Sequence, residues 1–240
     1  MQLLIDVGNT QIKYCFSDGE YSSEIKRCDK ENFDHLLSEI QGEPEFVLSG
    51  IIICAVSSEN TVANICAWAE SHSINCQILA TEQSTFGLVN SYQDFQTMGV
   101  DRWVAVLGAE KLYPGQNIII IDSGTATTID VIGKDKHHLG GWIIPGVELM
   151  KKSLFAGTDK VFGQFEKIDK LEFGTSTSNN VSFGCWSASV AAVEMAKSLT
   201  TSKLSKPLLI FTGGNGDDLN RLGNFGGSYI DNLIFVGMQR

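Results

Sequence analysis

The chain carries the same short pattern twice, about half its length apart. In each copy an apolar run ends in aspartate, glycine follows two residues later, and a second strand-like run comes after hydroxyl or amide side chains. The copies are Asp6-Val-Gly-Asn-Thr10 before QIKYCF and Asp122-Ser-Gly-Thr-Ala126 before TTIDVI. A duplicated half-domain produces such an echo, although D-x-G is also a common turn and short repeats arise by chance.

Each copy has two interpretations. Glycine lets the backbone approach a ligand closely, and neighbouring N–H groups and hydroxyls can then surround a phosphate. A carboxylate at the strand end can hold magnesium through water, and Lys13 is near enough in sequence to reach a terminal phosphate. The alternative is a hairpin turn that binds nothing. Two matched copies favour the phosphate site, because open α/β sheets bind ligands at strand ends such as the one before Asp122.

Hydrophobic periodicity predicts that helices and strands alternate, which indicates an α/β fold. The Gly-, Ser- and Thr-rich stretch 157–180 is predicted to be a loop that leads into a long helix. Strands are predicted at 2–7, 11–16, 46–56, 74–80, 117–122, 126–132, 139–144 and 207–212. Helices are predicted at 31–41, 59–72, 100–112, 146–156, 180–200, 215–222 and 231–239.

Composition excludes some classes of protein. The 18 Lys and Arg residues against 28 Asp and Glu give a net charge of -10, which argues against a duplex nucleic-acid binder but not against a phosphorylated small molecule. No apolar run is long enough for a bilayer, and the N-terminus lacks signal-peptide features, so we expect a cytoplasmic protein without membrane contact. The six cysteines form no C-x-x-C pair, which predicts free thiols rather than zinc.

The segment Gly99-Val-Asp101-Arg102 opens a predicted helix, because Val100, Val104 and Leu107 recur at helical spacing. Asp101 is then either a helix-capping residue or a weak catalytic base. Phosphoryl transfer can use a weak base, since its loose transition state needs the acceptor hydroxyl oriented more than deprotonated. Arg102 could bind a substrate carboxylate through two hydrogen bonds.

Two further turn-rich segments follow. The stretch Phe211–Gly216 leads from a strand through glycines into a helix. It either lets a nucleotide sugar or base lie against backbone, or is a plain strand-to-helix turn that uses glycine for its φ range. Gly140–Gly146, taken alone, is typical of simple Gly and Pro punctuation. The adjacent His137 and His138 point to opposite faces of a strand, so they are not expected to share a metal. Asp130 lies two residues after Thr128 and is either part of the second motif or solvent-exposed.

Taken together and in this order, the motifs closely resemble those of type III pantothenate kinases. This family belongs to the superfamily of actin, the acetate and sugar kinases and the heat-shock chaperone ATPases. The resemblance covers nearly the whole chain, and its specific part is Gly99–Arg102. The motifs are Asp6-x-Gly-Asn-Thr10, Gly99-x-Asp101-Arg102, Asp122-x-Gly-Thr-Ala126 with Thr128 and Asp130, Gly140-Gly141…Pro145-Gly146 and Thr212-Gly213-Gly214.

The resemblance implies a fold of two ribonuclease-H-like halves, each a mixed sheet flanked by helices, with ATP in the cleft between them. We therefore place the halves at residues 1–115 and 116–240. The implied reaction is ATP-dependent phosphorylation of pantothenate to 4′-phosphopantothenate, the first step of coenzyme A synthesis. It implies Mg²⁺ with ATP, a monovalent cation (K⁺ or NH₄⁺), and a homodimer in which the partner subunit completes the pantothenate site.

The resemblance also implies roles for individual residues. Asp101 matches the catalytic aspartate, Asp122 matches the ligand of the monovalent cation, and Asp6 acts through magnesium. Thr177 matches the threonine of the partner subunit that closes the pantothenate pocket, with Thr175 as the alternative. The implied ATP contacts are Asp6, Val7, Gly8, Asn9, Thr10, Gln11, Ile12, Lys13 and Thr125, and the implied substrate contacts are Tyr92, Gly99, Val100, Asp101, Arg102 and Thr177.

Two other functions compete with this one. Another small-molecule kinase of the same superfamily, such as a sugar or acetate kinase, would leave the Gly99–Arg102 motif unexplained. A non-catalytic regulator that binds nucleotide would have no need of Asp6, Asp101 and Asp122 together. No motif can be assigned to residues 217–240.

Overall fold

The computed structural model describes residues 1–8, 10–19, 22–29, 32–33, 37, 48–56, 59–156 and 168–239. The chain divides into two compact units. Unit 1 comprises Met1–Phe86, Tyr92–Lys111 and Asn232–Arg240, and unit 2 comprises Gly87–Ser91 and Leu112–Asp231. The sequence predicts a single division after residue 115. In the structure, unit 2 also contains the short segment 87–91, and unit 1 also contains 232–240.

Unit 1 is built on a five-stranded sheet in the order β3-β2-β1-β4-β5. Strand β1 pairs antiparallel with β2 and parallel with β4, so the sheet is mixed. The β1–β2 hairpin places Lys13 directly opposite Asp6 and Ile12 opposite Val7. The strands are β1 (Gln2–Val7), β2 (Ile12–Ser17), β3 (Lys26–Cys28), β4 (Gly50–Ala55) and β5 (Cys76–Ile78).

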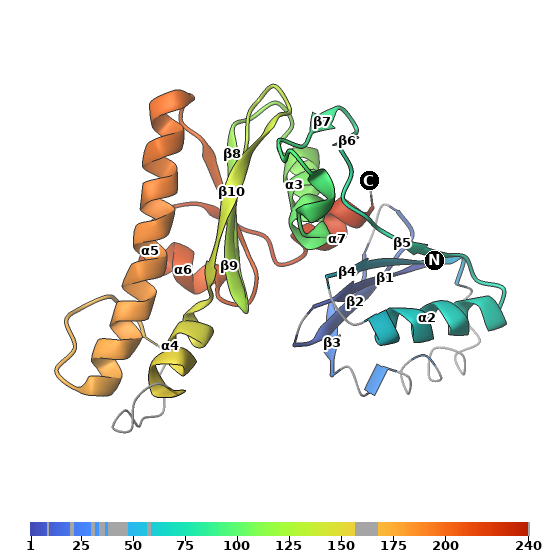
Figure 1. Cartoon of the computed structure of the whole chain (residues 1–240), viewed down its shortest axis with the longest axis horizontal. Coiled ribbons are helices and arrows are strands. Elements are labelled where there is room, and N and C mark those ends of the chain that lie inside the picture. The colour runs from blue at the N-terminus through green and yellow to red at the C-terminus, as the bar shows by residue number, and fades with distance from the viewer. Residues whose placement is uncertain are drawn as a thin grey trace. The chain divides into compact units, whose positions relative to one another are not determined.

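Helices cover both faces of this sheet. Successive side chains of a strand point to opposite sides, and here both sides carry apolar residues that must be buried. Leu3, Ile5 and Val7 of β1 pack on the side of α2 (Glu59–Ser71). Leu4, with Ile52 and Cys54 of β4, packs on the side of α3 (Val100–Leu112) and α7 (Leu233–Met238). Figure 1 shows α2 on one side of these strands.

Unit 2 repeats this plan with a sheet in the order β10-β9-β8-β11-β12. Strand β8 pairs antiparallel with β9 and parallel with β11, so this sheet is also mixed. The strands are β8 (Ile118–Ser123), β9 (Ala126–Ile132), β10 (His138–Pro145), β11 (Leu208–Thr212) and β12 (Ser228–Tyr229). The helices are α4 (Val147–Ala156), α5 (Thr177–Lys203) and α6 (Gly216–Leu222).

The two faces of the second sheet differ in chemistry. Ile119, Ile121 and Ile129 belong to the apolar core shared with α4, α5 and α6, which lie on one side of the strands in Figure 1. Register and alternation place Asp122 and Thr128 opposite each other on the other face, and Asp130 two residues further along that face. The polar residues of the second motif therefore share the face opposite to these three helices.

The fold class inferred from the sequence is confirmed, since each unit is a mixed sheet flanked by helices. The remaining short elements are β6 (Ser84–Thr85), β7 (Leu88–Val89) and the 3₁₀ turn η2 (Phe95–Thr97). The short strands β3, β6, β7 and β12 are absent from the sequence prediction.

Some predicted boundaries are displaced. Helix α5 begins at Thr177, so the predicted loop 157–180 ends before that residue, and β4 begins at Gly50 rather than at 46. Most of the helix predicted at 31–41 lies outside the described residues, as does 157–167. In the part of the chain that the structure describes, no helix has the length and apolar character needed to cross a bilayer.

Candidate active site

The first D-x-G turn joins β1 to β2 in unit 1. Asp6 is buried near the end of β1, and the Gly8 N–H donates to the Gln11 carbonyl oxygen at 3.1 Å. A Cβ at Gly8 would lie 3.1 Å from that same oxygen, so the turn is tight at this point. Thr10 and Gln11 are exposed, whereas Asn9 lies outside the described residues. The turn thus combines a sheltered carboxylate with an exposed rim.

The catalytic candidate Asp101 lies in the first turn of α3. Its Oδ1 accepts a hydrogen bond from the Arg102 N–H at 2.8 Å, and the Trp103 N–H donates to the Gly99 carbonyl at 3.1 Å. A Cβ at Gly99 would come within 2.6 Å of Asp101 Oδ1, so glycine leaves room for the carboxylate. Because a helix N-terminus favours negative charge, this position stabilises Asp101 in its ionised form.

The charges of Asp6 and Asp101 both act on the Cys54 thiol. Cys54 is the register partner of Asp6 across β1 and β4, and it is completely buried. Burial raises the pKa of the Cys54 thiol well above its usual value, and the charges of Asp6 and Asp101 raise it further. Two carboxylates that are far apart in sequence therefore lie around the same end of β4.

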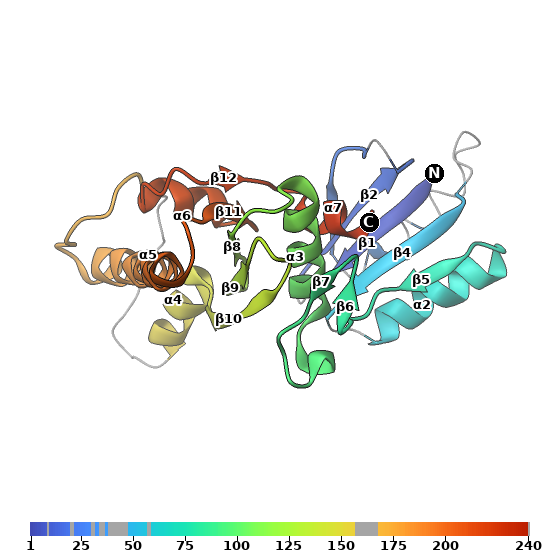
Figure 2. The same cartoon turned by 90° about the horizontal axis from the view of Figure 1, so that it is seen from above.

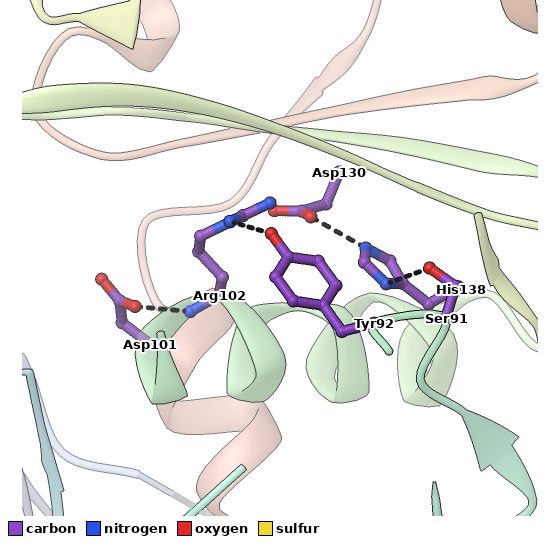
Figure 3. Close-up of polar contacts among 6 residues, drawn as sticks. All are labelled: Ser91, Tyr92, Asp101, Arg102, Asp130 and His138. Atoms are coloured by element: carbon purple, nitrogen blue, oxygen red, sulfur yellow. Dashed lines mark hydrogen bonds and ion pairs between the residues drawn. The ribbon is translucent and has the colours of Figure 1, made fainter. Parts of the chain in front are cut away.

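Arg102 is held in a defined position within unit 1. Its side chain is buried, Nη1 donates to the Tyr92 hydroxyl oxygen at 2.8 Å, and the guanidinium lies 5.8 Å from the centre of the Tyr92 ring. Figure 3 shows the two side chains pointing toward each other, with Asp101 at the start of the same helix. Arg102 and Tyr92 therefore form an oriented donor pair that suits a carboxylate or a polar ligand.

The second D-x-G turn connects β8 to β9 in unit 2. The Gly124 N–H donates to the Ala126 carbonyl at 2.9 Å, and the Ser123 and Thr127 hydroxyls lie 3.1 Å apart. Thr125 is exposed at the tip. As in the first turn, an acidic strand end is followed by exposed polar atoms.

Two other glycine segments close around this turn. Gly213 has a φ of +81°, and a Cβ there would lie 2.3 Å from Asp122 Oδ1 and 2.7 Å from the Ser123 carbonyl oxygen. The Gly146 N–H donates to the Thr125 carbonyl at 3.0 Å, and a Cβ at Gly146 would lie 2.2 Å from the Gly124 oxygen. The segment 140–146 is therefore more than a Gly- and Pro-containing turn, because Gly146 hydrogen-bonds to and packs against the second motif.

The chemistry of these groups fits the cations that the resemblance implies. Asp122 supplies a half-buried carboxylate beside backbone carbonyls, and hard cations prefer such oxygen ligands. Among the described residues no three His, Cys, Asp or Glu side chains gather as a metal cage. Magnesium at Asp6 would therefore depend on water and on phosphate oxygens for most of its ligands.

A buried polar chain in unit 2 was not anticipated from the sequence. His138 Nε2 lies 2.9 Å from Asp130 Oδ1, and Nδ1 lies 3.4 Å from the Ser91 hydroxyl oxygen (Figure 3). Both His138 and Asp130 are buried, so the alternative of an exposed Asp130 is wrong. The imidazole ring therefore bridges the Asp130 carboxylate and the Ser91 hydroxyl. The one sequence feature that pointed to this chain was the position of Asp130 on the same face of β9 as Thr128.

Thr177 is the first residue of α5 and is exposed. Ser176 caps the helix, since its hydroxyl oxygen accepts from the Asn179 N–H at 3.2 Å. Thr175 is exposed as well, one residue before this cap. Both threonines are thus accessible to a second molecule.

Sequence comparison identifies relatives over the full length. A model of the type III pantothenate kinase family matches residues 2–198. A type III pantothenate kinase of Colwellia psychrerythraea is 32% identical, with 100% of this chain and 99% of the relative covered. A type III pantothenate kinase of Pseudoalteromonas translucida is 34% identical, with coverage of 98% and 93%.

Solved structures share the fold. A Campylobacter jejuni protein described as a Baf family transcriptional activator has a TM-score of 0.64 at 24% identity, covering 99% of this chain and 95% of its own. A Sinorhizobium meliloti protein described as a 2-dehydro-3-deoxygalactonokinase has a TM-score of 0.60 at 12% identity, with coverage of 99% and 94%. At these identities the likeness concerns the fold alone.

Proposed function

The chain belongs to the type III pantothenate kinase family, and from that premise we propose the roles that its residues take in the reaction. It is a kinase that phosphorylates pantothenate in coenzyme A biosynthesis. The product we propose is 4′-phosphopantothenate. ATP is the proposed phosphate donor, and Mg²⁺ is the cation that binds with it. The observation that carries the assignment of roles is the grouping of Asp6, Asp101, Arg102 and Tyr92 in unit 1.

Asp101 is the catalytic residue in this proposal. The acceptor hydroxyl of pantothenate attacks the γ-phosphorus of ATP, Asp101 orients that hydroxyl and takes its proton, and ADP leaves. The hydrogen bond from the Arg102 N–H and the helix N-terminus keep the carboxylate ionised and fixed. That makes it a weak base, which suffices because the transition state of phosphoryl transfer is loose.

Arg102 and Tyr92 are the proposed contacts for the pantothenate carboxylate, together with Gly99 and Val100. A guanidinium binds a carboxylate best through two parallel N–H donors, and this requires a fixed plane. The Tyr92 hydroxyl and ring hold the Arg102 guanidinium at 2.8 Å and 5.8 Å, which supports such a role.

The two D-x-G turns are the proposed contacts for the phosphates and cations. Asp6–Lys13 would bind the triphosphate, with Asp6 acting through magnesium and Lys13 neutralising charge. Thr125 would contact ATP, and Asp122 would hold K⁺ or NH₄⁺, whose positive charge offsets that of the phosphates. The tight packing of Gly213 on Asp122 supports a fixed position for that carboxylate.

A homodimer is the proposed assembly, with Thr177 of the partner subunit completing the pantothenate site. Unit 2 presents apolar side chains on edge strand β10 and on α5, including Leu139, Trp142, Met195 and Leu199, which are 51%, 40%, 55% and 46% exposed. Exposed apolar groups that gather at the edge strand of a sheet commonly mark an interface, which supports a second copy as the partner.

A coupled assay of ADP release tests the catalytic assignment. The wild type is assayed with ATP, Mg²⁺ and pantothenate in K⁺ and then in Na⁺, beside Asp101→Asn. We expect turnover that requires pantothenate and is faster in K⁺, and a roughly 10²–10⁴-fold loss of kcat in the variant with ATP binding retained by calorimetry. Glu59→Gln is the matched control, because it removes an exposed acid from the first turn of α2 in the same unit.

Each outcome has a definite meaning. Full turnover by Asp101→Asn would remove Asp101 from the mechanism. ATP binding without pantothenate-dependent ADP release by the wild type would favour another acceptor or a non-catalytic nucleotide-binding role. An equal loss of kcat in Glu59→Gln would attribute the loss seen in Asp101→Asn to reduced helix stability.

A further inference from the structure

Two cysteine thiols lie in contact at the edge of unit 1. Cys66 Sγ on α2 and Cys76 Sγ on β5 are 3.0 Å apart, and both residues are half-buried. Figure 2 shows α2 running beside β5, the edge strand of the sheet. We propose that Cys66 and Cys76 are an oxidative modification site, which forms an intramolecular disulfide when the protein meets an oxidised low-molecular-weight disulfide such as glutathione disulfide.

The contact is specific to this pair. All six cysteines lie in the described part of the chain as free thiols, and theirs is the one sulfur–sulfur contact among them. Cys15, Cys54 and Cys185 are buried, so a reagent in solution has poor access to them. The structure leaves Cys66 partly accessible.

The cysteine near the proposed active site is protected by its surroundings. Burial and the charges of Asp6 and Asp101 raise the pKa of the Cys54 thiol, and only the thiolate reacts with disulfides. Oxidation of the Cys66–Cys76 pair can therefore proceed while Cys54 stays reduced.

The reaction has two exchange steps. The Cys66 thiolate attacks one sulfur of the small disulfide, forms a mixed disulfide and expels one small thiolate. The Cys76 thiolate then attacks Cys66 Sγ, the protein disulfide forms, and the second small thiolate leaves. Two electrons pass from the protein to the small disulfide, and the two protons of the cysteines end on the two small thiols.

The order of these steps follows from the environments. Burial, together with the neighbouring Cys66, raises the pKa of the Cys76 thiol to about 12, so Cys76 rarely offers a thiolate to a reagent in solution. It can still attack a mixed disulfide on Cys66, because it is held beside that sulfur at high effective concentration.

The disulfide would fasten the end of α2 to β5 without touching the kinase site. The turn between them is already closed by backbone hydrogen bonds from the N–H groups of residues 72, 73 and 74. Cys76 pairs with Ile51 at the start of β4, whereas Asp6 pairs with Cys54 near its other end. Oxidation is therefore expected to stabilise unit 1 and to leave turnover unchanged, and its test does not depend on the proposed function.

Peptide mapping of the folded full chain tests the proposal. The protein is incubated in glutathione buffers of increasing oxidised fraction, remaining thiols are alkylated, and the chain is cut after glutamate without reduction. Cleavage at Glu59, Glu70 and Glu82 separates Asn60–Glu70, which contains Cys66, from Ser71–Glu82, which contains Cys76. We expect one linked product, two hydrogens lighter than the sum of these peptides.

Variants and unfolding curves complete the test. Cys66→Ser and Cys76→Ser should abolish the linked product, whereas Cys28→Ser, which changes another half-buried thiol, should retain it. Oxidation should lower the unfolding equilibrium constant of the wild type and of Cys28→Ser by up to about 100-fold, the loop-closure value for a segment of this length. Unlinked peptides throughout, a link to another cysteine, or a link that forms only in urea would overturn the proposal.

Discussion

Replacing Gly213 by alanine tests whether Asp122 depends on its neighbours for its position. Gly213 has a φ of +81°, and a Cβ would lie 2.3 Å from Asp122 Oδ1. Relaxing this overlap to van der Waals distance requires the two groups to separate by roughly 1 Å. A Cβ would also lie 2.7 Å from the Ser123 carbonyl oxygen at the end of buried strand β8, so we expect both the Asp122 carboxylate and the turn at Gly213 to shift.

The expected cost has two parts. A left-handed φ costs a non-glycine residue about 1–2 kcal/mol, and forcing extra atoms into a packed site adds about 1–3 kcal/mol. Gly213→Ala should therefore lower the free energy of unfolding by about 2–5 kcal/mol. A 1 Å displacement of a functional group can cost about 100-fold, so we expect the K⁺ concentration for half-maximal turnover to rise by about 10–100-fold.

Two other glycines of unit 2 serve as matched controls. Gly115 has a φ of +70° and open space where a Cβ would lie, so Gly115→Ala should lose only the backbone contribution of about 1–2 kcal/mol. Gly214 has neither a positive φ nor a close neighbour, so Gly214→Ala should change little. Neither control should alter the response to K⁺.

Urea unfolding and ADP release over a K⁺ titration measure these effects. The reasoning fails if Gly213→Ala and Gly115→Ala lose equal stability and both keep the wild-type K⁺ response. Lost stability with an unchanged K⁺ response would keep the packing argument but remove Asp122 from the cation site.

Two shorter predictions concern unit 1. Tyr92→Phe removes the hydroxyl that accepts a hydrogen bond from Arg102 but keeps the ring. The KM for pantothenate should therefore rise about 10-fold, while the KM for ATP stays constant. An unchanged KM for pantothenate would contradict the role of Arg102. Burial raises the pKa of the Cys15 thiol from 9.0 to about 11, so the folded state favours the thiol, and its stabilising contribution is complete below pH 9 and is lost as pH rises toward 11. Cys15→Ala should therefore lose less stability over that window in urea unfolding, and equal losses would argue against this cause.

Local patterns predicted most of the regular structure. The run IIII before Asp122 indicated a buried strand, and the helical spacing of Val100, Val104 and Leu107 located α3 at its observed limits. The first is a continuous apolar run and the second is a 13-residue helix with a helical period, so local sequence determines both. Strands β6, β7 and β12 have two residues each, too few for a period to be visible.

The contacts that complete the candidate site could not be predicted in the same way. Gly213 reaches Asp122 only because β11 pairs in parallel with β8, so that Thr212 lies beside Asp122. His138 reaches Asp130 through the pairing of β10 with β9, and a bulge after His138 shifts that register. Such contacts depend on which strands become neighbours, and a single sequence does not encode that choice locally.

The helix α7 has a consequence for how the chain is made. Its Phe235 and Met238 complete the face of the first sheet that holds Leu4 and Cys54, yet Leu112–Asp231 separates it from the rest of unit 1. At roughly 5–20 residues per second, the ribosome needs on the order of ten seconds to translate that stretch. During this interval the nascent first sheet lacks its last covering helix, so its apolar face is a natural target for chaperones that act during synthesis.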